Sequence, residues 1–184
     1  MKNFIEFVQQ LYNTKEFIPL HVPHFFGKEK QYVNECIDST FVSSVGKFVN
    51  QFEASIAEYT GAKHAIAAVN GTAALHISLL ISGVKSGEEV ITQPLTFIAT
   101  ANAISYTGAM PVFVDVDRDT LGMSPEKLEH FLKQNTFFQN GYTYNKKSDQ
   151  LIRACVPMHT FGHPCRIDQI VQLCKKYNIR VIED

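Results

Sequence analysis

The sequence predicts an α/β fold in which a mostly parallel sheet carries helices on both faces. Two observations lead to this prediction. From about residue 64 onward, short apolar runs alternate with longer segments whose apolar residues recur at helical spacing. The runs are apolar almost throughout, and not only at every second position, which is typical of parallel strands that are buried on both sides.

The first 60 residues or so are predicted to be mainly helical. In the first helix, apolar residues recur at helical spacing with polar residues between them, which is typical of an amphipathic helix and not of a signal peptide: Phe4, Ile5, Phe7, Val8 and Leu11. Two more helices are expected at residues 28–38 and at about 47–59, with the segment FVSSVGKFV as an ordered loop between them.

In the rest of the chain, strands and helices are expected in strict alternation. The strands are predicted at residues 64–69, 89–92, 111–115, 152–157 and 180–183, and the helices at 72–81, 97–106, 125–134 and 167–177. The stretch 135–149 is polar, aromatic and glycine-containing, and we expect an irregular excursion on the surface there. Since the chain ends on VIED, directly after a predicted strand, we expect it to be part of a longer protein.

Composition and charge argue against several classes of partner. The formal net charge is -1, from 17 basic and 18 acidic side chains without a run of like charges, so no electrostatic footprint for nucleic acid or an anionic membrane surface is present. No stretch approaches the ~20 apolar residues of a transmembrane helix. The four cysteines form no C-x-x-C pair and are expected to be reduced thiols, which predicts a soluble cytoplasmic protein.

The first motif with chemical meaning is Asn70-Gly71-Thr72-Ala73, between a predicted strand and a helix. Gly71 permits a sharp turn and the close approach of a ligand. Thr72 offers a hydroxyl at the start of the helix, where unpaired N–H groups and the helix dipole attract an anion. The motif predicts a phosphate site, with the alternative that Thr72 only caps its helix. Neither G-x-G-x-x-G nor G-x-x-x-x-G-K is present, so a dinucleotide fold or a P-loop is not indicated.

The second motif, QPLTFIATAN at residues 93–102, follows the next predicted strand. Ligands of open α/β sheets bind outside the carboxyl ends of the strands, so Thr96 and Phe97 are expected to reach the same pocket as Thr72. The ring of Phe97 suits stacking on a flat heterocycle. The alternative is that Phe97 packs in the core.

The third motif is the loop MHTFGHP at residues 158–164, which is expected to be functional because it follows a strand and carries two histidines. Gly162 and Pro164 argue against the helix that would bring His159 and His163 to one face. No metal site is therefore predicted.

The fourth motif is the terminal pair Glu183-Asp184 at the end of a predicted buried strand. A carboxylate in such a place needs a partner, because burying an unpaired charge is costly. A cationic ring nitrogen would suit Asp184 as that partner. The alternative is that Asp184 caps a following helix.

Taken together, these motifs resemble the DegT/DnrJ/EryC1/StrS family of sugar aminotransferases, which depend on pyridoxal 5'-phosphate (PLP) and have the fold-type-I architecture. The segments that carry the resemblance are VSSVGKFVNQFE, NGTAAL, EVITQPLTFIATANAI, GAMPVFVDVD, HTFGHPCRID and VIED. VSSVGKFV and GTAALHISLLISGV look closest to the subgroup that aminates UDP-linked 4-keto-6-deoxy amino sugars on the way to bacillosamine or legionaminic acid.

The resemblance implies a role for each candidate residue. The cofactor phosphate is expected on Thr72 and the backbone of Ala73, and the pyridine ring against Phe97. Asp184 is expected to pair with the protonated ring nitrogen, and His159 to line the cofactor pocket. A carboxylate that keeps the ring nitrogen protonated makes PLP a better electron sink.

By the same resemblance, residues 1–184 are the N-terminal part of the large PLP-binding domain, including an N-terminal helical segment of about residues 1–60. The rest of the large domain and a small C-terminal domain are expected to follow. The lysine that bonds PLP covalently is also expected beyond residue 184, so this chain alone is expected to be inactive.

For the parent protein, the resemblance implies a homodimeric aminotransferase. It would move an amino group from glutamate to the C4 ketone of a UDP-linked 4-keto-6-deoxy amino sugar. One alternative is a PLP-dependent sugar dehydratase of the same family, in which a histidine replaces the lysine. The other is a non-catalytic module for PLP binding or dimerisation.

Overall fold

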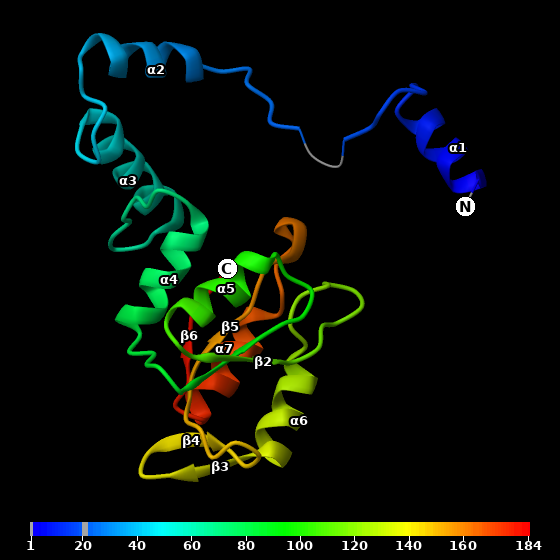
Figure 1. Ribbon diagram of the computed structural model, residues 1–184, viewed down its shortest axis with the longest axis vertical. Coiled ribbons are helices and arrows are strands. Elements are labelled where there is room, and N and C mark those ends of the chain that lie inside the picture. Colours follow the sequence, from blue (N-terminus) through cyan, green and yellow to red (C-terminus); the bar gives the residue numbers. More distant parts are fainter. Residues whose placement is uncertain (1, 20–21) are drawn as a thin grey trace. The chain divides into compact units, whose positions relative to one another are not determined.

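The structure is a computed structural model that describes residues 2–19 and 22–184. It divides into two compact units, Met1–Ala67 and Ala68–Asp184. The N-terminal unit contains the helices α1 (Lys2–Leu11), α2 (Glu29–Asp38) and α3 (Lys47–Thr60), as predicted (Figure 1). α3 ends at Gly61, whose φ of 71° is in the left-handed region that favours glycine.

The N-terminal unit has no core of its own among the residues that the structure describes, because none of the residues in α1, α2 or α3 is buried. The strand predicted at 64–69 is wrong. This segment has no regular secondary structure, and the side chains of Ile66 and Val69 are 84% and 88% exposed. A strand needs a neighbouring strand to complete its backbone hydrogen bonds, and no described segment pairs with these residues.

The C-terminal unit is built on a four-stranded sheet. Its strands are β1 (Glu89–Thr92), β2 (Met110–Phe113), β5 (Ile152–Val156) and β6 (Arg180–Val181). Their order is β2-β1-β5-β6, and all three pairings are parallel. The predicted parallel sheet is confirmed.

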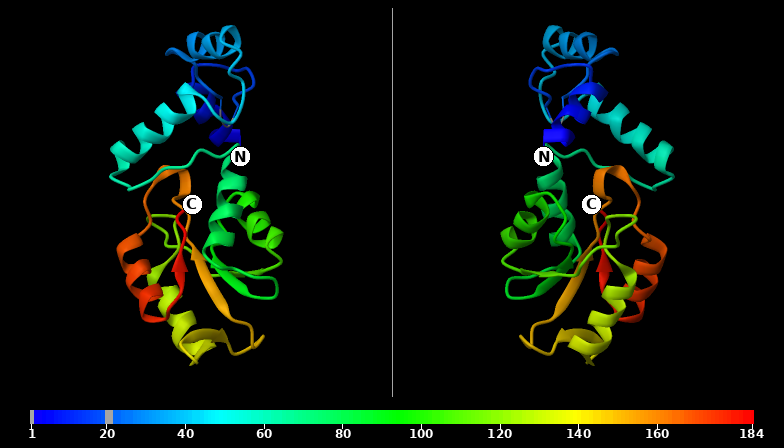
Figure 2. Two further views of the ribbon diagram at one scale, coloured as in Figure 1. Left: turned by 90° about the vertical axis from the view of Figure 1, so that its left-hand side faces the viewer. Right: turned by 90° about the vertical axis from the view of Figure 1, so that its right-hand side faces the viewer.

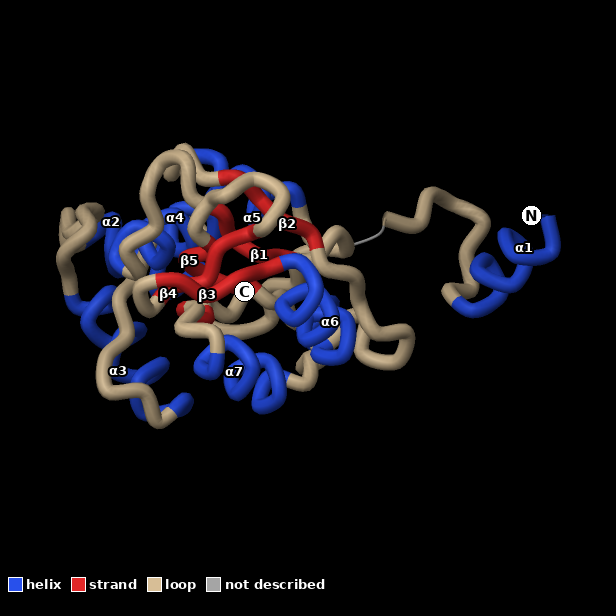
Figure 3. The backbone as a smooth tube through the Cα atoms, turned by 90° about the horizontal axis from the view of Figure 1, so that it is seen from below, coloured by secondary structure: helices blue, strands red, loops and turns tan. Residues whose placement is uncertain are grey.

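Helices cover both faces of this sheet (Figure 2, Figure 3). They are α4 (Gly71–Ile81), α5 (Ile98–Tyr106), α6 (Pro125–Asn135) and α7 (Ile167–Lys176). Successive residues of β1 point to opposite faces, so Val90 belongs to the core under α4 and α5, and Ile91 to the core under α6 and α7. Because both faces of the central strands are covered, apolar residues of β1 and β5 are buried on either side, among them Val90, Ile91, Ala154 and Cys155.

The stretch 135–149 forms a hairpin, so the prediction of an irregular excursion is wrong. β3 (Thr136–Gln139) pairs antiparallel with β4 (Tyr142–Asn145). Between them, Asn140 and Gly141 have φ of 51° and 81°, the pair of positive values that a tight two-residue hairpin turn requires. The rings of Phe137 and Tyr144 stack across the strands with centroids 5.4 Å apart.

Within residues 2–19 and 22–184, no helix has both the length and the apolar character that crossing a bilayer requires.

Candidate functional site

The segments that carry the predicted site residues gather at one edge of the sheet in the C-terminal unit. Figure 2 shows the start of α4, the end of β6 and the loop after β5 at this edge. Because the strands are parallel, their carboxyl ends share this edge, where open α/β sheets bind their ligands. The predicted residues therefore lie where a ligand is expected.

At the start of α4, Asn70 caps the helix. Its side-chain oxygen accepts a hydrogen bond of 2.8 Å from the backbone N–H of Ala73. The alternative that Thr72 caps this helix is therefore wrong. The Thr72 hydroxyl forms no hydrogen bond with any residue that the structure describes, so it is available to a ligand.

Of the two phosphate contacts expected here, the Ala73 amide is already engaged by Asn70. The first N–H groups of a helix have no acceptor within the helix, so the amides of Gly71 and Thr72 are also donors for an anion. A Cβ on Gly71 would meet no atom within 4 Å, so the turn itself does not require glycine. The space in front of Gly71 is open for a ligand.

Asp184 is held at three points. Its N–H donates to the carbonyl of Pro157 at 3.0 Å, and its carbonyl accepts from the N–H of His159 at 2.9 Å. Its carboxylate Oδ2 accepts a hydrogen bond of 2.5 Å from the Thr100 hydroxyl. These contacts extend the backbone pairing past Val181, where β6 ends.

Phe97 lies immediately before α5 with its ring 76% exposed. The alternative that it packs in the core is therefore wrong. Phe97 precedes Thr100 by three residues, so it lies one helical turn from the side chain that contacts Asp184. An exposed aromatic ring at this edge of the sheet is suited to cover a flat cationic ring.

The imidazole of His159 is fixed through both ring nitrogens. Nδ1 accepts a hydrogen bond of 3.2 Å from the N–H of Cys165, and Nε2 lies 3.1 Å from Oε2 of Glu183. Since Nδ1 accepts, we assign the ring proton to Nε2, which donates to Glu183. His163 makes no comparable contact in the described chain, and none of the described residues form a cluster of ligands for a metal.

The structure joins two of the predicted residues directly and places the other two at the same edge of the sheet without a hydrogen bond to them. His159 and Asp184 are joined through their backbones, and Phe97 is one turn from the contact between α5 and Asp184. Thr72 lies at the same edge of the sheet, but no hydrogen bond among the described residues joins it to Phe97, His159 or Asp184. A ligand of the size of PLP, with a ring and a phosphate at opposite ends, would be needed to bridge them.

Gln93 is a structural residue of this site that the sequence did not single out. Its fully buried side chain accepts hydrogen bonds from the N–H groups of Met123 (2.8 Å) and Met158 (3.2 Å). Its amide group donates to the carbonyl of Leu95 (2.9 Å) and to the hydroxyl of Thr160 (3.1 Å). The signal was a polar residue directly after a buried strand, within the motif QPLTF.

The loop that carries His159 is also held by contacts that do not involve Gln93. Arg166 pairs with Asp117 and, at 2.5 Å, with Asp119. A Cβ at Gly122 would lie 2.4 Å from the Cβ of Cys165, so glycine is needed where the two loops meet. Burial raises the pKa of the Cys165 thiol, and the Glu183 carboxylate raises that pKa further.

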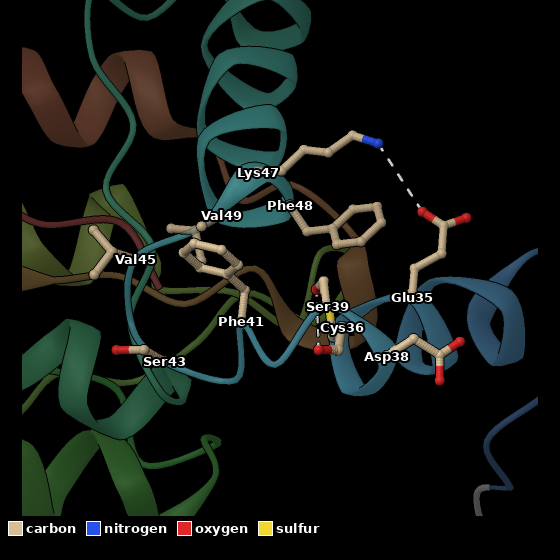
Figure 4. A pocket seen from close by; sticks show the side chains of 11 residues that line it. Glu35, Cys36, Asp38, Ser39, Phe41, Ser43, Val45, Lys47, Phe48 and Val49 are labelled. Atoms are coloured by element: carbon tan, nitrogen blue, oxygen red, sulfur yellow. Dashed lines mark hydrogen bonds and ion pairs between the residues drawn. The ribbon is translucent and has the colours of Figure 1, made fainter.

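The N-terminal unit contains a hollow of about 670 Å³ between α2, α3 and the loop that joins them (Figure 4). Its lining includes Phe41, Val45 and Phe48, and Nζ of Lys47 lies 4.0 Å from Oε2 of Glu35 at its rim. None of the predicted site residues lines it.

Comparison with known proteins identifies a family and several relatives. Residues 25–184 match the family described as DegT/DnrJ/EryC1/StrS aminotransferase family. GDP-perosamine synthase of Escherichia coli O157:H7 is 43% identical over 169 residues, which are 92% of this chain and 42% of that protein. The chain thus spans less than half the length of this curated relative.

Solved structures show the same architecture. An aminotransferase from Psychrobacter cryohalolentis has a TM-score of 0.74 and 34% identity over 92% of this chain and 38% of that one. A Bacillus subtilis protein solved with the bound cofactor PMP (pyridoxamine phosphate) has a TM-score of 0.71 and 25% identity, covering 92% of this chain and 38% of that one. These similarities confirm the predicted fold-type-I architecture.

Proposed function

The chain belongs to the DegT/DnrJ/EryC1/StrS aminotransferase family, and from that premise we propose that it forms the cofactor-binding part of a PLP-dependent nucleotide-sugar aminotransferase. The observation that carries this proposal is the fixed Asp184 carboxylate at the edge of the sheet. Its Oδ2 is engaged by Thr100, whereas Oδ1 has no partner among the described residues. A carboxylate oxygen with no protein partner is suited to a cationic ring nitrogen.

The residues present fit PLP at both of its ends. The Thr72 hydroxyl and the amides at the start of α4 offer donors to a phosphate, and the helix dipole favours its charge. Asp184 offers an acceptor to the ring nitrogen, and the exposed ring of Phe97 offers a face for the pyridine. Donors for the anionic end and an acceptor for the cationic end therefore lie at the same edge of the sheet.

Each residue has a defined task in this proposal. When bound, PLP supplies an electron sink for the negative charge that develops on the substrate carbon. Asp184 keeps the ring nitrogen protonated, and Thr72 holds the phosphate. Phe97 covers one face of the ring. His159, with its proton fixed on Nε2 by Glu183, lines the pocket as a neutral group.

We further propose that the amino donor is glutamate and that the acceptor is the C4 ketone of a UDP-linked 4-keto-6-deoxy amino sugar. The support for this acceptor is the resemblance of VSSVGKFV and GTAALHISLLISGV to the subgroup with that activity. The name of the E. coli relative points to a competing acceptor, a sugar linked to GDP. The proposed setting is the cytoplasm, and the proposed assembly is a homodimer.

The test is transfer of a label from ¹⁵N-glutamate in the full-length protein loaded with PLP. UDP-linked and GDP-linked 4-keto-6-deoxy sugars serve as matched acceptors, and NMR locates the label in the product. We expect ¹⁵N at C4 of the UDP sugar. Label in the GDP sugar alone would contradict the proposed nucleotide.

The same assay separates the two alternatives. Loss of a sugar hydroxyl without incorporation of ¹⁵N would identify a dehydratase. PLP binding without conversion of either sugar would identify a non-catalytic module.

A further inference from the structure

We propose that Thr100 is a positioning residue that fixes the orientation of the Asp184 carboxylate toward the cofactor, a role that rests on the proposed function of Asp184. Thr100 lies in the first turn of α5, and its side chain is 1% exposed. Its hydroxyl bonds to Oδ2 of Asp184 at 2.5 Å, across 84 residues of sequence. A buried hydroxyl thus contacts one oxygen of the carboxylate that is proposed to act on the cofactor.

The direction of the hydrogen bonds follows from the chemistry of the groups. An ionised carboxylate carries no hydrogen, so Thr100 donates to Asp184. The Thr96 hydroxyl, 2.8 Å from the Thr100 oxygen, then donates to Thr100. The Thr96 hydroxyl is also placed to donate to the sulfur of Met158 at 3.0 Å, but because sulfur is the weaker acceptor we assign its single hydrogen to the Thr100 oxygen. Two hydroxyls in series therefore point their hydrogens toward the carboxylate.

The backbone of Asp184 does not depend on Thr100, because Pro157 and His159 hold it by separate hydrogen bonds. Loss of the Thr100 hydroxyl would therefore leave the Asp184 backbone in place and release only rotation of its carboxylate. The role proposed for Thr100 is one of orientation, which distinguishes it from a general contribution to folding.

The hydrogen bond from Thr100 also determines which oxygen of the Asp184 carboxylate is available to the cofactor. Every buried side-chain oxygen and nitrogen in the part of the chain that the structure describes has a hydrogen-bond partner. Oδ1 of Asp184 has none among residues 2–19 and 22–184, so the described residues leave this oxygen unengaged. Thr100 thus engages Oδ2 and leaves Oδ1 for the ring nitrogen.

The test compares two probes, pyridoxamine 5'-phosphate and its deaza analogue, in which a carbon replaces the ring nitrogen. Dissociation constants are measured by calorimetry on the full-length protein. The wild type is expected to prefer the natural compound, because only this compound can pair with Asp184. Thr100→Val removes the hydroxyl at nearly constant volume and is expected to reduce that preference roughly tenfold or more, since it deletes a hydrogen bond to a charged group.

Three further variants complete the experiment. Thr100→Ser keeps a hydroxyl and is expected to retain the preference. Thr107→Val removes a hydroxyl that bonds only within the end of α5 and the turn after it, and is expected to retain it as well. Thr100→Ala serves if Thr100→Val does not fold, and circular dichroism monitors folding. Because both probes are measured on the same sample, a partly unfolded fraction cancels in the ratio.

Asp184→Ala separates failure of this inference from failure of the proposed function. If Asp184→Ala abolishes the preference and Thr100→Val keeps it, the positioning role is refuted and the role of Asp184 stands. If Asp184→Ala leaves the preference unchanged, the proposed role of Asp184 is refuted together with the inference. Loss of the preference in both variants, with rescue by Thr100→Ser, is the expected result.

Discussion

Replacing Gln93 by leucine is expected to destabilise the protein and loosen its cofactor site together. Gln93 is fully buried and connects three loops at the edge of the sheet. Leucine has a similar size but can neither donate nor accept hydrogen bonds. The change therefore removes the shared anchor of the loops that carry Phe97 and His159.

The expected loss in the free energy of unfolding follows from the backbone N–H groups that Gln93→Leu leaves without an acceptor. The N–H groups of Met123 and Met158 lose the oxygen of Gln93 as their acceptor, and a buried donor left unsatisfied costs about 1–3 kcal/mol. Met123 is fully buried, whereas Met158 is half-buried and its N–H is more easily reached by water. Thr160 keeps its own bond of 2.8 Å to the carbonyl of Leu121. We expect a net loss of about 2–3 kcal/mol in the free energy of unfolding.

The assay is urea unfolding of the full-length protein followed by far-UV circular dichroism, together with equilibrium dialysis of PLP. Gln172→Leu on the exposed side of α7 is the matched control and is expected to change stability by less than about 0.5 kcal/mol. A loss below about 1 kcal/mol for Gln93→Leu, with PLP affinity unchanged, would refute the anchoring role.

Three further changes have defined outcomes. Thr72→Val deletes a hydroxyl proposed to bond phosphate and should weaken PLP retention by about 1.5–3 kcal/mol in equilibrium dialysis; unchanged affinity would remove Thr72 from the phosphate site. Asp184→Asn should lower kcat by roughly a hundredfold or more while PLP binding changes far less, because the phosphate contacts stay intact; wild-type turnover with bound PLP would contradict the assigned role. The pKa of the Cys155 thiol is raised well above its ordinary value of 9.0, first by a hydrogen bond with Cys174 and then by burial. Above pH 9.0 the unfolded chain releases the thiol proton while the folded chain keeps it, so the stabilisation from the protonated Cys155 is present below pH 9.0 and is lost as the pH rises above that value. Urea midpoints should therefore fall more above about pH 9 in the wild type than in Cys155→Ala.

The parallel sheet and its helices were predictable because burial on both faces leaves a strong pattern in the sequence. In runs such as EVIT and RACV, consecutive apolar residues point to opposite faces of the sheet, and both are buried. The strand at 64–69 had the same local pattern, but strand formation depends on a neighbour, which a single segment cannot reveal. Asn140-Gly141 is a strong turn signal for the hairpin, but the polar composition of the residues around it differs from the apolar runs that mark the strands of the parallel sheet.

In the candidate site, the sequence indicated residue types and their loops but not their hydrogen-bond partners. Asn70 and Thr72 are both good helix caps by type, and only the structure shows that Asn70 accepts from Ala73. Gln93 and Thr100 bond to residues far away in the sequence, so local patterns do not identify these partners, although the position of Gln93 directly after a buried strand is a signal for the residue itself. Their roles depend on loops that meet only after the sheet has formed.

The protonation state of the pyridine nitrogen is the most direct test of the role proposed for Asp184. PLP labelled with ¹⁵N in its ring is bound to the full-length protein, and the nitrogen chemical shift is measured by NMR in the wild type and in Asp184→Asn. We expect a protonated nitrogen in the wild type and loss of that proton in Asp184→Asn, because the amide cannot stabilise the charge. An unprotonated nitrogen in the wild type, or the same protonated shift in both proteins, would contradict it.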